Sequence, residues 1–227
     1  MVLSLGNSSI EAVLFDLDGT LLDTAPDLAF ALNSTRITRQ LKTLELSSIR
    51  PHVSYGADGM IKHAYGDTIS SEMHKKIKAE LISCYEKNIA NKTQLFSGLS
   101  VSLAHLDAVN MPWGIVTNKP RHLTLPLLKA LNLYDRATCI VCGDDVENTK
   151  PHPESIHLAC KLINISADKA VYIGDAKRDI QAGNSAGNKT IACQFGYIPP
   201  SEDIHTWHAS AIAKTSSHLS DWLLTLK

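Results

Sequence analysis

Short apolar runs alternate with longer amphipathic segments over most of this 227-residue chain. Apolar runs of this length are typical of buried strands, and the longer segments place apolar residues at helical spacing. Such alternation favours an α/β fold, in which a mostly parallel sheet carries helices on both faces. The expected strands are residues 12–15, 113–116, 139–141, 170–173, 190–193 and 209–213. The expected helices are residues 101–109, 123–131, 153–163, 179–186 and 217–226.

The alternation fails between Asp23 and about Gln94, where the pattern is helical throughout. Thr24 can cap a helix with Pro26 in its first turn, a place where proline is accepted. A second helix is expected over residues 57–64. Further along, apolar residues recur at helical spacing on one face. They are Met73, Ile77, Leu81, Cys84, Tyr85 and Ile89.

A helical block between the first and second strands is best explained as an insertion into the α/β core. Its ends, near residues 22–25 and 96–98, would serve as hinges. We therefore expect a core built from residues 1–22 and 98–227 and a helical cap domain at 23–97. Because the block begins directly after a strand end, it should lie over that edge of the sheet.

Composition and charge narrow the functional class. The formal net charge of −1 argues against broad attraction to nucleic acid or to an anionic membrane. No segment has the apolar length needed to span a bilayer. Residues 1–10 lack the basic and apolar regions of a signal peptide, so a cytoplasmic protein is expected, either a monomer or a homodimer.

The five cysteines do not form an evident framework. Cys139 and Cys142 are spaced C-x-x-C within an apolar run. In a strand, residues three apart face opposite sides, so the two sulfurs would diverge. Buried structural thiols are therefore favoured over a zinc or redox site.

The first expected strand ends in two carboxylates, Asp16 and Asp18, followed by Gly19 and Thr20. Carboxylates two residues apart in an extended chain lie on the same side, here at the strand end where open α/β sheets bind ligands. Two such charges repel each other unless a cation lies between them. The pattern therefore predicts a cation site.

Three further polar clusters follow later strands, and parallel strands bring their carboxyl ends to one edge of the sheet. Thr117, Asn118 and Lys119 follow the second strand, and Lys150 lies beyond the third. Asp175 follows the fourth strand, with Asp179 four residues later.

This inventory fits phosphoryl transfer with one Mg²⁺ ion. Oxygen atoms of Asp16 and Asp175 suit Mg²⁺, and a carboxylate can attack phosphorus to form an acyl phosphate. Asp18 could give a proton to the leaving oxygen and later take one from water. Thr117 and Lys150 would hold the phosphate oxygens. Asp179 could orient metal-bound water from behind the ligands.

The four clusters resemble the four motifs of the haloacid dehalogenase (HAD) superfamily of phosphotransferases, and the resemblance covers most of the chain. It implies a Rossmann-like core with an inserted helical cap. It also implies that Asp16 is the nucleophile and Asp18 the general acid/base, with the backbone carbonyl of Asp18 on the metal. The implied metal ligands are Asp16, Asp18 and Asp175, and the implied phosphate-binding residues are Thr117, Asn118 and Lys150.

The segments at 24–27, 114–120, 143–146, 150–153 and 180–183 resemble the phosphoglycolate phosphatase branch of the superfamily. Close relatives in that branch include phosphatases of N-acetylmuramic acid 6-phosphate. The segment from Asp175 to Arg178, and Cys142 before Gly143, lean toward the latter group. Ser97 stands before Gly98 where the family often has proline, which leaves the second hinge less stiff.

The resemblance implies a phosphatase of a small phosphorylated metabolite, and three hypotheses stay open. The first is a phosphoglycolate phosphatase-like enzyme, with N-acetylmuramic acid 6-phosphate as the alternative substrate. A sugar phosphomutase of the same fold and a non-catalytic binding module are the others. In the cap, Arg50, Tyr55 and Gly56 either face the substrate or connect two helices.

Overall fold

The computed structural model describes residues 3, 5 and 10–227. The segment expected not to be a signal peptide therefore falls mostly outside the described residues. Within the described part of the chain, no helix combines the length and the apolar character that a membrane span requires.

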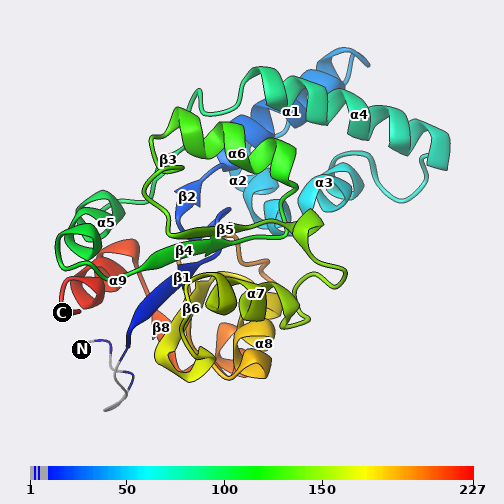
Figure 1. Ribbon diagram of the computed structural model, residues 1–227. Coiled ribbons are helices and arrows are strands. Elements are labelled where there is room, and N and C mark those ends of the chain that lie inside the picture. The colour runs from blue at the N-terminus through cyan, green and yellow to red at the C-terminus, as the bar shows by residue number, and fades with distance from the viewer. Residues whose placement is uncertain (1–2, 4, 6–9) are drawn as a thin grey trace.

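Six parallel strands form the central sheet, in the spatial order β5-β4-β1-β6-β7-β8 (Figure 1). From β1 the chain moves outward through β4 to β5, then returns to β6 on the other side of β1. This reversal places the ligand-binding edge of the sheet beside β1. The strands are β1 (Ala12–Phe15), β4 (Trp113–Val116), β5 (Cys139–Val141), β6 (Ala170–Gly174), β7 (Lys189–Cys193) and β8 (Ala211–Ala213).

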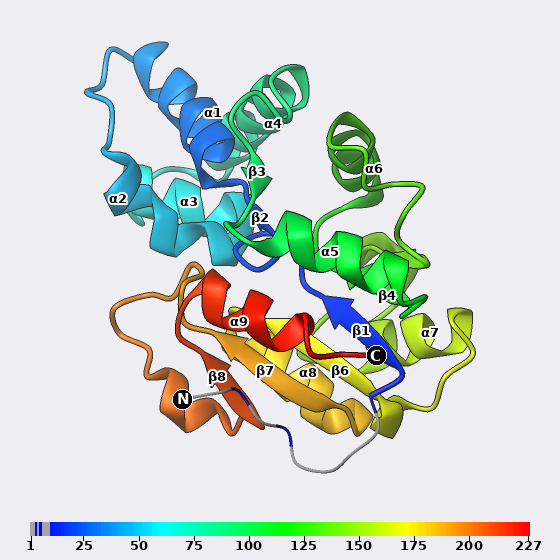
Figure 2. The same ribbon diagram turned by 90° about the vertical axis from the view of Figure 1, so that its left-hand side faces the viewer.

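Helices cover both faces of the sheet, as the alternating pattern predicts (Figure 2). Val13 and Phe15 of β1 point into one apolar cluster, and Ala12 and Leu14 point into another. Helices α5 (Leu99–Ala108), α6 (Arg121–Ala130) and α9 (Ser216–Leu223) supply the first cluster. Helices α7 (Glu154–Leu162) and α8 (Lys177–Ala186) supply the second. Burial on both faces explains why the strands read as continuous apolar runs.

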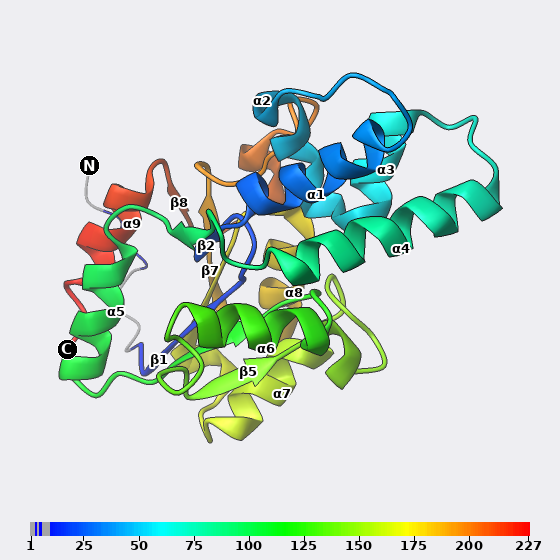
Figure 3. The same ribbon diagram turned by 90° about the horizontal axis from the view of Figure 1, so that it is seen from above.

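The insertion is a separate helical layer above the carboxyl edge of the sheet (Figures 1 and 2). It has its own apolar cluster, in which α1 and α4 lie side by side (Figure 3). We call this layer the helical insert. Its helices are α1 (Ala25–Ile37), α2 (Leu46–Ile49), α3 (Gly56–Tyr65) and α4 (Ser71–Lys87). Short 3₁₀ helices lie at Arg50–Tyr55, Gly143–Asp145, Ala167–Lys169 and Ile204–Trp207.

The expectation that the insert is helical throughout is wrong at its two ends. Strand β2 (Leu22–Asp23) pairs with β3 (Gln94–Leu95) in an antiparallel ladder. Two-residue strands leave too short an alternation to be recognised in sequence. The ladder joins the chain entering the insert to the chain leaving it, so the two expected hinges form one unit.

Element boundaries differ from the expected ones by a few residues. The last strand begins at Ala211 rather than at residue 209, and the last helix ends at Leu223 rather than at residue 226. Helix α4 buries Ile77, Leu81 and Tyr85 as expected, but Met73 is 41% exposed in its first turn. Ile89 lies beyond the end of α4.

Candidate active site

Strand ends from the core and helices of the insert enclose a cavity of about 580 Å³. Four of the residues singled out in the sequence line it, namely Asp16, Asp18, Thr117 and Asn118. Tyr55 and Gly56 line it from the insert. Lys150, Asp175 and Asp179 lie behind this wall, and all three are buried.

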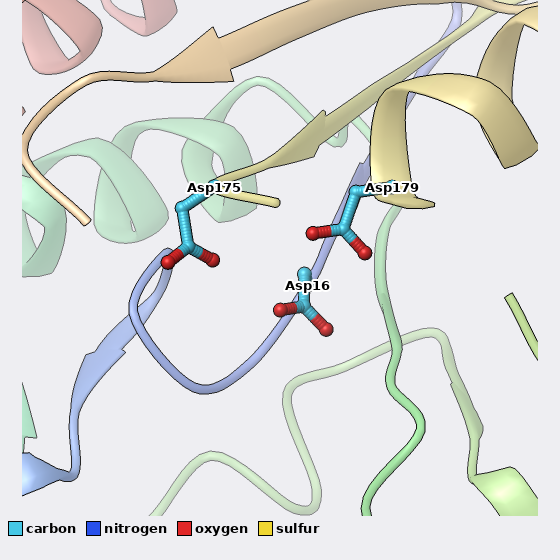
Figure 4. Close-up of side chains that lie close together, drawn as sticks. All are labelled: Asp16, Asp175 and Asp179. Atoms are coloured by element: carbon cyan, nitrogen blue, oxygen red, sulfur yellow. The ribbon is translucent and has the colours of Figure 1, made fainter. Parts of the chain in front are cut away.

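Three carboxylates, from Asp16, Asp175 and Asp179, converge at the carboxyl edge of the sheet (Figure 4). Asp16 follows β1, Asp175 follows β6, and Asp179 lies in the first turn of α8. One oxygen from each lies within 4.8 Å of the others, and all three side chains are buried. Parallel pairing of β1 with β6 brings the first two acids together, as the strand-end argument predicts.

Lys150 is the cation in direct contact with this cluster among the described residues. Its Nζ lies 2.7 Å from Oδ1 of Asp16 and 2.8 Å from Oδ1 of Asp179. It also donates to the Tyr172 hydroxyl and the Val116 carbonyl, at 2.7 and 3.0 Å. Burial alone would lower the pKa of Lys150, but Asp16 and then Asp179 outweigh it and raise that pKa. The ammonium therefore stays charged in a buried setting.

Asp175 is held by neutral groups. Thr20 donates its hydroxyl to Oδ1 at 2.9 Å, and the backbone N–H of Tyr197 donates to Oδ2 at 2.7 Å. Gly19, at φ +88°, passes so close that a Cβ there would lie 2.2 Å from Oδ2 of Asp175. Only glycine fits both that backbone conformation and that contact.

The acidic cluster is suited to a divalent cation. Burial raises the pKa of Asp16 to about 6, with Lys150 opposing the shift. Burial, then the charges of Asp16 and Asp179, raises the pKa of Asp175 to about 8. Within the described residues, Asp175 forms no ion pair. A hard cation with oxygen ligands would supply the missing charge, which is the preference of Mg²⁺.

Asp179 is already engaged through both carboxylate oxygens. Oδ1 contacts Lys150, and Oδ2 accepts a 2.9 Å hydrogen bond from the N–H of Ala176. These contacts fix the carboxylate against the start of α8. The expectation that Asp179 orients metal-bound water from behind the ligands stays a prediction.

Asp18 turns away from the acidic cluster toward the insert. Its Oδ1 accepts hydrogen bonds from the Thr24 hydroxyl at 2.6 Å and from Lys119 Nζ at 3.1 Å. Thr24 occupies the N-cap position of α1 with Pro26 in the first turn, as expected, but its side chain makes no capping hydrogen bond because the hydroxyl donates to Asp18. The Tyr197 hydroxyl instead accepts from the N–H of Ala25 at 2.9 Å.

Asn118 fixes the backbone of Lys150. The two residues exchange hydrogen bonds, from Lys150 N–H to Asn118 Oδ1 at 3.1 Å and from Asn118 Nδ2 to Lys150 O at 3.0 Å. Thr117 is buried, and its hydroxyl accepts from the N–H of Lys119 at 3.1 Å. The second and third sequence clusters thus form one structural unit.

Arg50 does not line the cavity. Its guanidinium donates to both oxygens of Asp23, at 2.8 and 3.0 Å, and lies over the Tyr197 ring. Tyr55 reaches the core, where its hydroxyl donates to Glu202 at 3.0 Å. Of the three expected cap residues, Arg50 therefore joins the β2–β3 junction, while Tyr55 and Gly56 border the cavity.

Sequence reasoning named Lys119 and Arg178 without giving either a role, and it missed Tyr197. Lys119 follows Thr117 by two residues, so strand alternation places both side chains on the same side and could have assigned Lys119 to the site. Its Nζ lies 4.6 Å from the centre of the Tyr85 ring in α4. Arg178 belongs to a segment that the sequence singled out, but without a role. Tyr197 carries no local signal.

Several known proteins are similar to this chain in sequence. The family model described as haloacid dehalogenase-like hydrolase matches residues 13–193. N-acetylmuramic acid 6-phosphate phosphatase from Pseudomonas putida is 36% identical over 203 residues, covering 89% of this chain and 91% of that protein. Phosphoglycolate phosphatase from Xanthomonas campestris pv. campestris is 36% identical over 208 residues, covering 92% of this chain and 94% of that protein.

Solved structures agree on the fold. The crystal structure of a predicted phosphoglycolate phosphatase from Haemophilus somnus superposes with a TM-score of 0.83 at 24% sequence identity. The match covers 95% of this chain and 99% of that one.

Proposed function

This chain belongs to the haloacid dehalogenase-like hydrolase family and is a phosphatase of that type, and we propose how it acts. It hydrolyses a small phosphorylated metabolite with Mg²⁺, through an aspartyl phosphate formed on Asp16. The observation that carries the proposal is the buried cluster of Asp16, Asp175 and Asp179 with Lys150 beside it. Mg²⁺, when bound, would neutralise phosphate charge next to these carboxylates.

Asp16 is placed to act as the nucleophile. Lys150 engages its Oδ1, and among the described residues no side-chain hydrogen bond to Oδ2 is formed, so Oδ2 would be available to the metal or the substrate. In the first step, a carboxylate oxygen of Asp16 bonds to phosphorus and the ester P–O bond breaks. Asp18, on the cavity wall, gives its proton to the departing oxygen.

The second step regenerates the enzyme. Asp18 takes a proton from water, the water oxygen bonds to phosphorus, and the bond from phosphorus to Asp16 breaks. Thr117 and Asn118 border the same cavity and would hold phosphate oxygens. The helical insert would exclude bulk water during both steps and so serve as the cap.

The substrate is the finer part of the proposal. The names of the two curated relatives above point to N-acetylmuramic acid 6-phosphate and phosphoglycolate. Both compounds are phosphate monoesters that also carry a carboxylate. A cavity of about 580 Å³ is much larger than the two-carbon acid of phosphoglycolate requires, which favours the sugar phosphate.

Purified enzyme tests the chemistry. With Mg²⁺, we expect release of inorganic phosphate from one or both compounds, and none after chelation with EDTA. Asp16→Asn should abolish turnover while the circular dichroism spectrum stays unchanged. Substantial turnover by that variant, or activity that survives EDTA, contradicts the proposal. An isomeric sugar phosphate as product would instead identify a phosphomutase.

The covalent step has its own test. In the Asp18→Asn variant, Asp16 should still attack 4-nitrophenyl phosphate, because its leaving group needs no proton. Hydrolysis of the resulting aspartyl phosphate should be slow, because the base that activates water is gone. After an acid quench, mass spectrometry should then find one phosphoryl group on Asp16. Absence of that adduct during a demonstrated burst of nitrophenol contradicts the aspartyl phosphate.

A further inference from the structure

Three cationic side chains line the main cavity, and two of them are already paired. Lys78 Nζ lies 2.7 Å from Oδ2 of Asp58, and Lys119 Nζ lies 3.1 Å from Oδ1 of Asp18. Arg178 is the third. Among the residues that the structure describes, it forms neither an ion pair nor a side-chain hydrogen bond. Its guanidinium donors are therefore available to a ligand in the cavity.

Arg178 lies where the main cavity adjoins a smaller one, and it is also close enough to the acidic cluster for the charges of Asp179, Asp16 and Asp175 to act on it. It also lines a neighbouring cavity of about 220 Å³, together with Ser54 and Tyr55, whereas Thr117 and Asn118 line only the main one. The acid in the neighbouring cavity is Glu202, which accepts from the Tyr55 hydroxyl and makes no ion pair with Arg178. No protein carboxylate of this wall therefore occupies the guanidinium.

The acidic cluster accounts for the charge of Arg178 without satisfying its hydrogen bonds. Burial alone would lower the pKa of Arg178, but the charges of Asp179, Asp16 and Asp175 outweigh it and raise that pKa. A guanidinium that is mostly removed from water, yet unpaired, gains most from a planar anion that accepts two parallel hydrogen bonds. A carboxylate has that shape.

We propose that Arg178 binds a carboxylate that the substrate carries in addition to its phosphate ester. Arg178 then selects phosphorylated acids over neutral phosphorylated sugars, while Asp16 and its neighbours treat the phosphate of either alike. The inference rests on the proposed phosphatase function and names the class of its substrate.

Matched substrate pairs test this selection. N-acetylmuramic acid 6-phosphate and N-acetylglucosamine 6-phosphate differ by the lactyl ether that bears the carboxylate. 2-Phosphoglycolate and 2-hydroxyethyl phosphate form a second pair. Wild-type enzyme should have the higher kcat/KM for the acid of a pair. Arg178→Gln should lower that value by about tenfold to a hundredfold, the worth of a charged hydrogen-bonded pair, and leave the neutral partner near wild type.

The control is Lys161→Gln, which removes the same charge from an exposed residue of α7 that lines neither cavity. It should keep the preference for the acid. If Arg178→Gln lowers kcat/KM equally for both members of a pair, Arg178 acts on the phosphate or the acidic cluster, and the proposal is overturned. An unchanged preference in Arg178→Gln overturns it as well.

Binding separates this inference from the catalytic proposal. Calorimetry on Asp16→Asn protein with Mg²⁺ gives Kd for each ligand whether or not the wild type turns it over. We expect tighter binding of the acid of a pair, and loss of that difference in the Asp16→Asn, Arg178→Gln double variant. Wild-type inactivity toward all four esters would contradict the proposed function, whereas equal Kd values within each pair would contradict the role of Arg178.

Discussion

The hydroxyl of Thr24 donates a 2.6 Å hydrogen bond to Oδ1 of Asp18. Thr24 is fully buried at the start of α1, the first residue beyond the β2 strand. The proposed acid/base of the core is therefore held by the segment that enters the helical insert. A movement of the insert that displaces Thr24 would therefore lengthen or break this hydrogen bond to Asp18.

Replacing Thr24 should impair turnover more than folding. Thr24→Val keeps the shape but removes the hydrogen bond to a charged group, worth about 1.5–3 kcal/mol. If that bond orients Asp18 for proton transfer, kcat should fall by about tenfold to a hundredfold. Steady-state kinetics measures the change, and Thr24→Ser, which keeps the hydroxyl, should stay near wild type. An unchanged kcat in Thr24→Val would show that Lys119 alone suffices to orient Asp18.

Arg50 should act on the junction rather than on the substrate. Its two hydrogen bonds to Asp23 join the insert to β2. The pair is partly exposed, so Arg50→Met should lower the free energy of unfolding by only about 1 kcal/mol, measured by urea denaturation. Lys62→Met is the control, because its pair with Asp67 is more than 70% exposed on both sides. A raised KM with unchanged stability would instead support the substrate contact expected from sequence.

The cysteines should behave as structural thiols. Burial raises the pKa of Cys139 to about 12 and that of Cys142 to about 11. At pH 8 the thiolate fraction of Cys139 is then about 10⁻⁴, too low for rapid alkylation. Cys84 is the one cysteine that is not buried. Iodoacetamide should therefore label native protein once, and Cys84→Ser should label not at all. Rapid labelling of Cys139 or Cys142 would reopen the redox interpretation.

Sequence reasoning succeeded where a feature is set by neighbours in the chain. Continuous apolar runs located β1 and β4, because strands buried on both faces leave no other pattern. Parallel pairing then brought Asp16 and Asp175 to one edge, as the topology requires.

Features that depend on tertiary contacts escaped it. A threonine before a helix favours a side-chain capping hydrogen bond, yet the Thr24 hydroxyl donates to Asp18 instead. Tyr197 donates hydrogen bonds to Asp175 through its N–H and to Asp23 through its hydroxyl, and these partners are 22 and 174 positions away in the sequence. No local periodicity reports a contact over that separation. The proposed role of Arg178 also depends on tertiary contacts. The sequence does not show that Lys78 and Lys119 are paired with carboxylates while Arg178 is not.

Metal binding should change the dependence of stability on pH. In metal-free protein, the pKa of Asp175 is raised from 3.8 to about 8. Between those values the folded state holds a proton that the unfolded state has lost, so the free energy of unfolding falls as pH rises from about 4 to 8. Above about pH 8, Asp175 is ionised in both the folded and the unfolded state, so its contribution to the free energy of unfolding no longer changes with pH. Mg²⁺ binds the ionised form, and should therefore raise the Tm more at pH 8 than at pH 5.

Asp175→Asn separates this effect from the other titrating groups. The amide carries no charge, so in EDTA the Tm of the variant should fall less than that of the wild type between pH 5 and pH 8. The variant should also lose most of the rise in Tm with Mg²⁺, because the ion loses an anionic ligand. Differential scanning fluorimetry measures the Tm of variant and wild type at both pH values, once with Mg²⁺ and once with EDTA. Equal responses of variant and wild type to Mg²⁺ would place the ion elsewhere than beside Asp175.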